Sequence, residues 1–86
     1  MEMKEPFSLS SLAVGEWGRV QSIETRGPMR RRLLDIGLTL GAPVRRLLQS
    51  PFGDPSAYEI GGAVFALRKE DACQVLVEPS GGTLWS

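Results

Sequence analysis

Histidine is absent from this 86-residue sequence, and cysteine occurs once, at Cys73. Without histidine the chain lacks the commonest general base near neutral pH and the commonest ligand for transition metals. A single cysteine excludes an intrachain disulfide and any Cys-X-X-Cys motif. The carboxylates are scattered along the chain rather than grouped as a catalytic or metal-binding pair. We therefore expect no enzymatic activity, no cofactor and no metal site.

Long apolar runs are also missing, and none approaches the roughly 20 residues of a membrane-spanning helix. The N-terminal stretch, MEMKEPFSLSSLAVG, has acidic residues and a proline where a secretory signal has a basic start and a continuous apolar run. Hydrophobic residues make up 42% of the chain and charged residues 23%, which is typical of a globular protein. The sequence thus predicts one domain located in the cytoplasm, without membrane insertion.

Charge is balanced overall, with ten basic and ten acidic residues, but it is unevenly distributed. Residues 19–46 hold seven of the ten basic residues and two acidic ones, so this segment carries +5 and the remainder carries −5. The densest part is residues 29–41, MRRRLLDIGLTLG, with three consecutive arginines. Because electrostatic attraction depends on where charges lie, a binding site is to be sought first in this segment.

Short apolar segments separated by turn residues predict a mainly β fold. We place five strands at residues 19–24, 44–49, 57–60, 64–67 and 75–77. Val20 and Ile23 both suit a core but are three residues apart, so the first strand is expected to contain a bulge or to coil. Residues 61–63 predict a glycine hairpin turn, and residues 68–72 a single helical turn. Five such strands predict a small closed or nearly closed barrel.

One longer helix is expected between the first two strands, from Pro28 to about residue 36. Proline is tolerated in the first helical turn, and Gly37 suits the left-handed residue after the helix end. Arg31 and Asp35, four residues apart, are expected to form a weak surface ion pair. An apolar stripe at helical spacing consists of Met29, Leu33 and Ile36.

Taken in order, these pieces resemble the ferrous iron transport protein A (FeoA) family. The resemblance lies in four blocks: LSSL at 9–12 with GE at 15–16 and GRV at 18–20, RRRLLDIG at 30–37 with Leu38 and Gly41, SPFGDP at 50–55, and YEIG at 58–61 with ALRK at 66–69. It implies a small SH3-like barrel of five strands, with one short helix between the first two and a helical turn before the last. We accordingly divide the chain into an N-terminal arm (1–8), a FeoA-like domain (9–78) and a flexible C-terminal tail (79–86).

The family resemblance also implies a function. Its members are cytosolic accessory and regulatory proteins of bacterial ferrous iron uptake, and the implied partner is the cytoplasmic, GTP-binding region of the ferrous iron permease. We assign no catalytic residue. We place the partner-binding surface at Arg30, Arg31, Arg32, Leu34, Leu38, Phe52 and Asp54, with Arg26 and Arg45 or Arg46 extending the basic patch.

Each of these residues also has a purely structural interpretation. Arginine has good helix propensity, so the triplet is equally well explained as a solvated helix face. Leu34 and Leu38 can enter the core instead of a surface, and Asp54 is expected to bond its local backbone. Cys73 is expected to be a small buried hydrophobic residue.

Two other functions compete with binding of the permease. Small barrels with basic patches also bind nucleic acid, although zero net charge, a pI near 6.2 and few aromatic residues beside the arginines speak against it here. A stand-alone relative of the SH3-like domain of iron-dependent repressors is the second alternative. Self-association stays open, as does a role for Leu84 and Trp85 of the tail in an interface.

Overall fold

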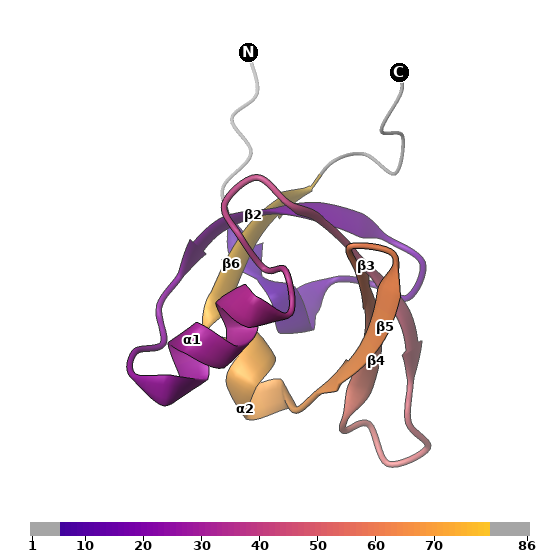
Figure 1. Ribbon diagram of the computed structural model, residues 1–86. Coiled ribbons are helices and arrows are strands. Elements are labelled where there is room, and N and C mark those ends of the chain that lie inside the picture. Colours follow the sequence, from indigo (N-terminus) through magenta and orange to yellow (C-terminus); the bar gives the residue numbers. More distant parts are fainter. Residues whose placement is uncertain (1–5, 80–86) are drawn as a thin grey trace.

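A six-stranded antiparallel sheet forms the framework of the computed structural model, which describes residues 6–79 (Figure 1). Most of the expected arm and tail, including Leu84 and Trp85, lies outside these residues. The elements in chain order are β1 (Phe7–Ser8), η1 (Leu9–Ser11), β2 (Trp17–Ile23), α1 (Pro28–Asp35), β3 (Pro43–Gln49), β4 (Ser56–Ile60), β5 (Ala63–Leu67), α2 (Lys69–Ala72) and β6 (Val75–Pro79).

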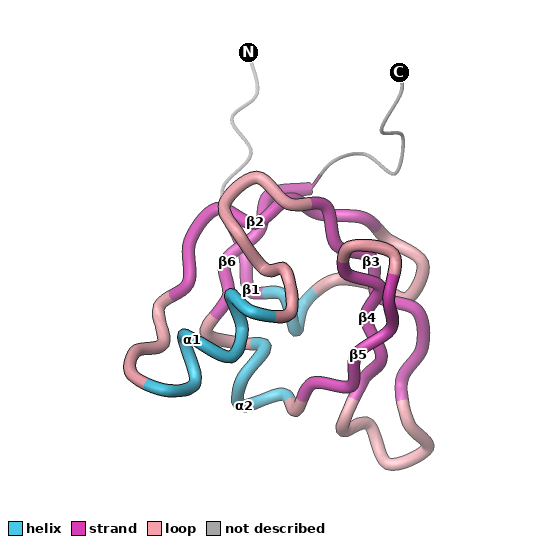
Figure 2. The backbone as a smooth tube through the Cα atoms, viewed as in Figure 1, coloured by secondary structure: helices cyan, strands magenta, loops and turns pink. Residues whose placement is uncertain are grey.

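The strands pair in the order β1-β6-β2-β3-β4-β5, and Figure 2 shows them following one curved path around the molecule. Within residues 6–79 no ladder joins β1 to β5, so the curled sheet stays open between its two ends. The mainly β fold is confirmed, as are the helix between the first two long strands and the helical turn before the last strand.

The number of strands differs from the five predicted. The additional strand, β1, contains only Phe7 and Ser8, which pair with Val77 and Leu76 of β6. A two-residue strand is too short to show the alternation of apolar and polar residues by which strands are predicted. The last part of the expected arm is therefore an edge strand of the sheet.

The bulge expected in the first long strand is present in β2. Val20 pairs with Val77 and Ser22 pairs with Leu76, so Gln21 is the extra residue on its strand. This insertion reverses the facing of the residues that follow it. As a result Val20 and Ile23 are both buried although they are three residues apart.

A hydrophobic core fills the concave side of the sheet and takes residues from every part of the described chain. Tyr58 is the largest fully buried side chain, and Leu33 is the buried residue of α1. Met29 and Ile36 pack against this core, as the predicted stripe requires. The remaining buried hydrophobic residues are Leu9, Leu12, Val20, Ile23, Leu38, Val44, Ile60, Leu67, Ala72, Val75 and Val77.

The end of α1 explains why Leu38 belongs to the core. Gly37 has φ of 110°, and its N–H donates to the Leu34 carbonyl (3.0 Å), while the Leu38 N–H donates to the Leu33 carbonyl (3.1 Å). This pair of bonds is the Schellman motif, which turns the residue after the glycine back toward the helix. Leu38 and Leu33 are both fully buried.

Candidate functional site

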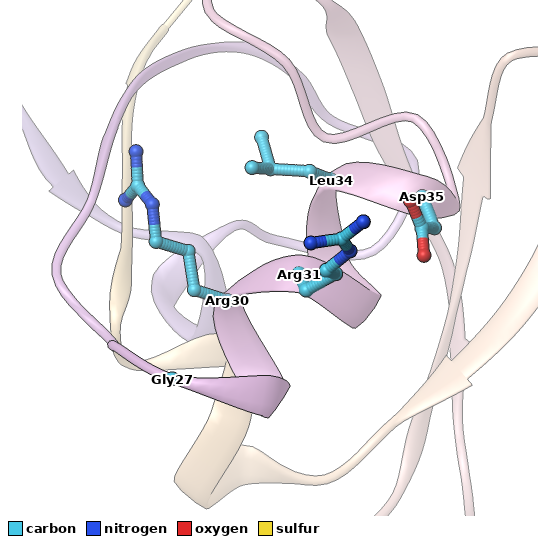
Figure 3. Close-up of a pocket in the computed structure, with 5 residues that line it drawn as sticks. All are labelled: Gly27, Arg30, Arg31, Leu34 and Asp35. Atoms are coloured by element: carbon cyan, nitrogen blue, oxygen red, sulfur yellow. The ribbon is translucent and has the colours of Figure 1, made fainter.

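An open pocket of about 420 Å³ lies along the exposed side of α1 (Figure 3). It is lined by Gly27, Arg30, Arg31, Leu34 and Asp35, and we call it the α1 pocket. Figure 3 shows the side chains of Arg30 and Leu34 extending on the same side of the helix, with Arg31 and Asp35 further along it. The structure thus brings together three of the seven residues placed in the partner-binding surface.

The three consecutive arginines have different surroundings. Arg30 donates from Nη1 to the carbonyl oxygen of Ile23 at 2.9 Å, which holds its guanidinium beside the end of β2. The Arg31 side chain lines the pocket and has no hydrogen bond or ion pair with any residue from 6 to 79. Arg32 is exposed and lies outside the pocket lining.

The ion pair expected between Arg31 and Asp35 is not formed. Across the described chain the one ion pair joins Arg45 Nη2 to Glu59 Oε1, at 2.9 Å. The spacing of Arg31 and Asp35 permits a contact, but an exposed pair at this spacing contributes only about 0.3–0.5 kcal/mol. The charges of Arg31 and Asp35 are therefore both available to the α1 pocket.

The two leucines assigned to the surface have different environments. Leu34 is half-buried, packs against the core and lines the α1 pocket. Leu38 is fully buried. Its assignment to the partner-binding surface was wrong, because the Schellman motif after α1 turns it inward.

Phe52 and Asp54 lie in the loop between β3 and β4, apart from the α1 pocket (Figure 1). The Phe52 side chain is 94% exposed. Asp54 Oδ1 accepts a 2.7 Å hydrogen bond from the backbone N–H of Lys69, the first residue of α2, and not from its own loop. A carboxylate suits this place because the N-terminal end of a helix carries partial positive charge. Asp54 therefore fixes the loop that presents Phe52.

Arg45 and Arg46 serve the fold and do not extend the basic patch. The Arg45 guanidinium lies 5.1 Å from the centre of the Trp17 ring while it pairs with Glu59. Arg46 donates to the Leu12 carbonyl (2.7 Å) and to Ser56 Oγ (2.8 Å). The sequence held a signal for Arg46, since it is two residues from Val44 and so shares the buried side of β3.

A smaller polar pocket of about 170 Å³ lies beside Arg46 and includes Ser56, Tyr58 and Lys69 in its lining. Burial raises the pKa of the Tyr58 phenol above its ordinary value, and the nearby Arg46 charge and the Ser56 hydrogen bond partly oppose this. Burial has the largest effect. It raises the pKa because a site without water favours the neutral phenol over the charged phenolate.

Stability should therefore decrease at alkaline pH. Below pH 10 the phenol is protonated in both states, and above it the unfolded chain loses the proton first, which favours unfolding. Tyr58 is the sole tyrosine, so tyrosinate absorbance reports this group alone. We expect a titration midpoint above 10 in the native protein and near 10 in urea. Equal midpoints would contradict this, and Tyr58→Phe should remove the signal.

The side chain of Cys73 lies at the surface, on the turn after α2. The expectation that Cys73 is buried was therefore wrong. Its thiol donates a hydrogen bond to the Glu70 carbonyl at 3.3 Å. Within residues 6–79 no three His, Cys, Asp or Glu side chains gather where they could hold a metal ion. None of the described helices is long and apolar enough to cross a membrane.

Comparison with known proteins places the chain in a family. A model of the FeoA domain matches residues 7–79. Over 70 residues the chain is 34% identical to the Fe(2+) transport protein A/Fe(2+) transporter FeoB fusion protein of Porphyromonas gingivalis. This alignment covers 81% of the chain and 8% of the fusion protein, so the chain spans less than a tenth of that relative.

Solved structures agree with the sequence comparison. Iron(II) transport protein A of Clostridium thermocellum superposes with a TM-score of 0.84 at 31% identity, covering 87% of this chain and 46% of that one. The zinc complex of FeoA from Stenotrophomonas maltophilia, described as an SH3 domain protein, gives 0.74 at 31% identity, covering 83% and 88%. A manganese-dependent transcriptional repressor gives 0.77 at 25% identity, covering 86% and 41%. The chain therefore belongs to the FeoA family, which is linked to ferrous iron transport and has an SH3-like fold.

Proposed function

We propose that this protein is a cytoplasmic accessory of bacterial ferrous iron uptake. It binds the cytoplasmic, GTP-binding region of the ferrous iron permease and regulates it. Binding uses the exposed arginines of α1 as the main contact and Phe52 as a second one. The protein carries out no catalytic step of its own.

The observation that carries this proposal is the fused relative. In Porphyromonas gingivalis the part similar to this chain is covalently joined to an Fe(2+) transporter. Joining two modules makes their encounter intramolecular and raises the effective concentration of each for the other, commonly to the millimolar range. Such a link is useful where the two modules act on each other, so the fusion supports a ferrous iron transporter as the partner of the domain that this chain resembles.

The charge distribution of α1 supports a protein partner. Arg30 and Arg31 lie in the first turn, where positive charge opposes the helix dipole at a cost of about 0.3–1 kcal/mol each before screening, whereas Arg32 belongs to the last turn, where the dipole favours it. The first turn contains no acidic residue to offset them. A helix selected for stability alone has acidic residues there, so the arginines suit an acidic surface outside the chain.

Phe52 gives the proposal its second contact. The Phe52 side chain is 94% exposed and so has apolar surface ready to bury, and the backbone of its loop loses little freedom on binding because Asp54 already holds the loop. The loop between β3 and β4 that carries Phe52 lies apart from α1, so a partner that contacts both must reach from one to the other (Figure 1).

A heteronuclear NMR titration tests the proposal directly. The isotope-labelled protein is titrated with the permease's cytoplasmic domain, once with GDP and once with a non-hydrolysable GTP analogue. We expect the amide signals of α1 and of the loop around Phe52 to move, and to move differently with the two nucleotides if the protein senses the GTPase state. If no signal moves with either nucleotide, the proposal is refuted.

The likeness to a manganese-dependent repressor and the basic charge of residues 19–46 favour one competing function, repressor-like binding of DNA by this chain itself. The same titration with a DNA duplex separates the two functions. Binding to DNA through a basic patch is steeply weakened by salt, because phosphate contacts release counterions. Shifts with DNA that vanish between about 50 and 200 mM salt, without shifts from the permease domain, would favour the repressor-like function.

A further inference from the structure

The α1 pocket has a definite order of chemical groups along its length. Arg30 provides a positive charge on one side of the pocket, Leu34 provides an apolar wall between the two arginine head groups, and Arg31 with Asp35 provides a positive and a negative charge on the other side (Figure 3). Such an order selects a ligand by the sequence of its own groups and not by charge alone.

We propose that the α1 pocket binds an acidic residue followed by an apolar one on the surface of a protein partner. The carboxylate of an aspartate or glutamate lies against Arg31, the neighbouring apolar side chain covers Leu34, and Arg30 adds positive charge on the other side of Leu34. That the permease supplies this segment rests on the proposed function. The preference of the pocket for an acidic residue followed by an apolar one rests on the pocket residues themselves.

Arg30 is positioned in advance for this contact. One of its five N–H donors is used by the Ile23 carbonyl at 2.9 Å, which fixes the guanidinium while leaving the other donors for a ligand. A side chain that is already held loses less freedom when a ligand binds, so more of the interaction energy contributes to affinity.

Arg31 supplies the charge that a carboxylate would neutralise. Its side chain has no ion pair or hydrogen bond with the described residues, although Asp35 is one helical turn away. A guanidinium binds a carboxylate through two parallel N–H···O bonds, which are stronger than the single bonds between neutral groups. The pocket therefore offers the unengaged Arg31 to the carboxylate, with the held Arg30 on the other side of Leu34 (Figure 3).

The other two groups distinguish a protein carboxylate from a phosphate. Leu34 provides apolar surface, which a strongly hydrated phosphate group cannot use. Asp35 repels a doubly charged anion, while it favours a donor or a cationic residue at that end of the ligand. A short acidic-apolar protein segment satisfies all four positions.

Arg32 provides a matched control for Arg31. Both belong to α1, both are exposed, and reversal to glutamate changes the net charge equally, but Arg32 does not line the pocket. Weaker long-range attraction should therefore lower the affinity of both variants equally. Loss of a contact inside the pocket should lower the affinity of Arg31→Glu alone.

The experiment measures the affinity of three proteins, wild type, Arg31→Glu and Arg32→Glu, for the permease's cytoplasmic domain by calorimetry. We expect Arg31→Glu to lose at least tenfold in affinity and Arg32→Glu to lose less than threefold, with both giving the amide spectrum of a folded protein. If wild type binds and the two variants lose equally, the pocket is not the contact and the inference is overturned while the proposed function stands.

A second measurement tests the pocket without the permease. The labelled wild-type protein is titrated with two capped dipeptides, acetyl-Asp-Leu-amide and acetyl-Asn-Leu-amide. We expect the amide signals of Arg31 and Leu34 to move with the aspartyl peptide at millimolar concentration and not with the asparaginyl one. Equal or absent shifts would overturn the pocket's chemistry. Shifts with the aspartyl peptide and no binding of the permease domain would refute the proposed function alone.

Discussion

Reversing Arg30, Arg31 and Arg32 together to glutamate is expected to weaken binding to the permease's cytoplasmic domain by about 100-fold or more. Placing like charges opposite each other in an interface costs several kcal/mol, and each 1.4 kcal/mol is tenfold in affinity. The three reversals place acidic side chains where the proposed partner surface is itself acidic. Calorimetric titration of the variant against the domain measures the loss.

The same variant should remain folded, which is what makes the expected loss informative. Glutamate at positions 30 and 31, in the first turn of α1, interacts favourably with the helix dipole, and this offsets the reversal of Arg32 in the last turn, which costs about 0.3–1 kcal/mol. None of the three arginines belongs to the core, and within the described chain the reversals remove the hydrogen bond from Arg30 to the Ile23 carbonyl. The amide spectrum and the thermal midpoint should therefore stay close to those of wild type.

A control variant separates position from net charge. The triple reversal moves the formal net charge from zero to −6, which by itself slows association with an acidic partner. Reversing Arg19 and Arg68 to glutamate and changing the exposed Gln21 and Gln74 to glutamate gives the same net charge at sites away from the α1 pocket. We expect this control to lose less than tenfold. Equal losses for the two variants, or normal binding by the Arg30–Arg32 triple, would refute α1 as the contact.

Features of the fold that depend on residues close together in the sequence could be predicted from it. The bulge in β2 could be expected because Val20 and Ile23 are both apolar at a spacing that a regular strand does not permit. The limits of α1 could be expected because proline and glycine act on their own backbone. Such signals act within a few residues of their own positions.

Residues whose role depends on distant partners were placed less well. Arg46 was counted with the basic patch, but its guanidinium bonds the Leu12 carbonyl and Ser56, each ten or more positions away. Asp54 was expected to bond its own loop, and its partner is the N–H of Lys69. Composition alone could not show which of the arginines line a pocket. That depends on the orientation of α1 about its own axis, which is set by the burial of Leu33 in the core.

Leu38→Ala is expected to reduce the free energy of unfolding by about 2–5 kcal/mol, the range for truncating a fully buried leucine. A domain of this size has a total stability of only about 4–13 kcal/mol, so the loss is a large share of it. Chemical denaturation followed by tryptophan fluorescence measures the change. Leu40→Ala is the matched control, because Leu40 lies two residues later in the same connection and is 72% exposed. It should change stability by no more than about 0.5 kcal/mol.

The position of Leu38 connects this loss of stability to the α1 pocket. Leu38 and Leu33 are both buried at the Schellman end of α1, and together they hold the C-terminal end of the helix on the core. A cavity at Leu38 should therefore loosen α1 before the sheet, which hydrogen exchange would show as earlier loss of protection at Leu33 and Leu34 than in β4. Similar losses of stability in both leucine variants would contradict the assignment of Leu38 to the core. Uniform loss of protection in Leu38→Ala would show that α1 and the sheet unfold together.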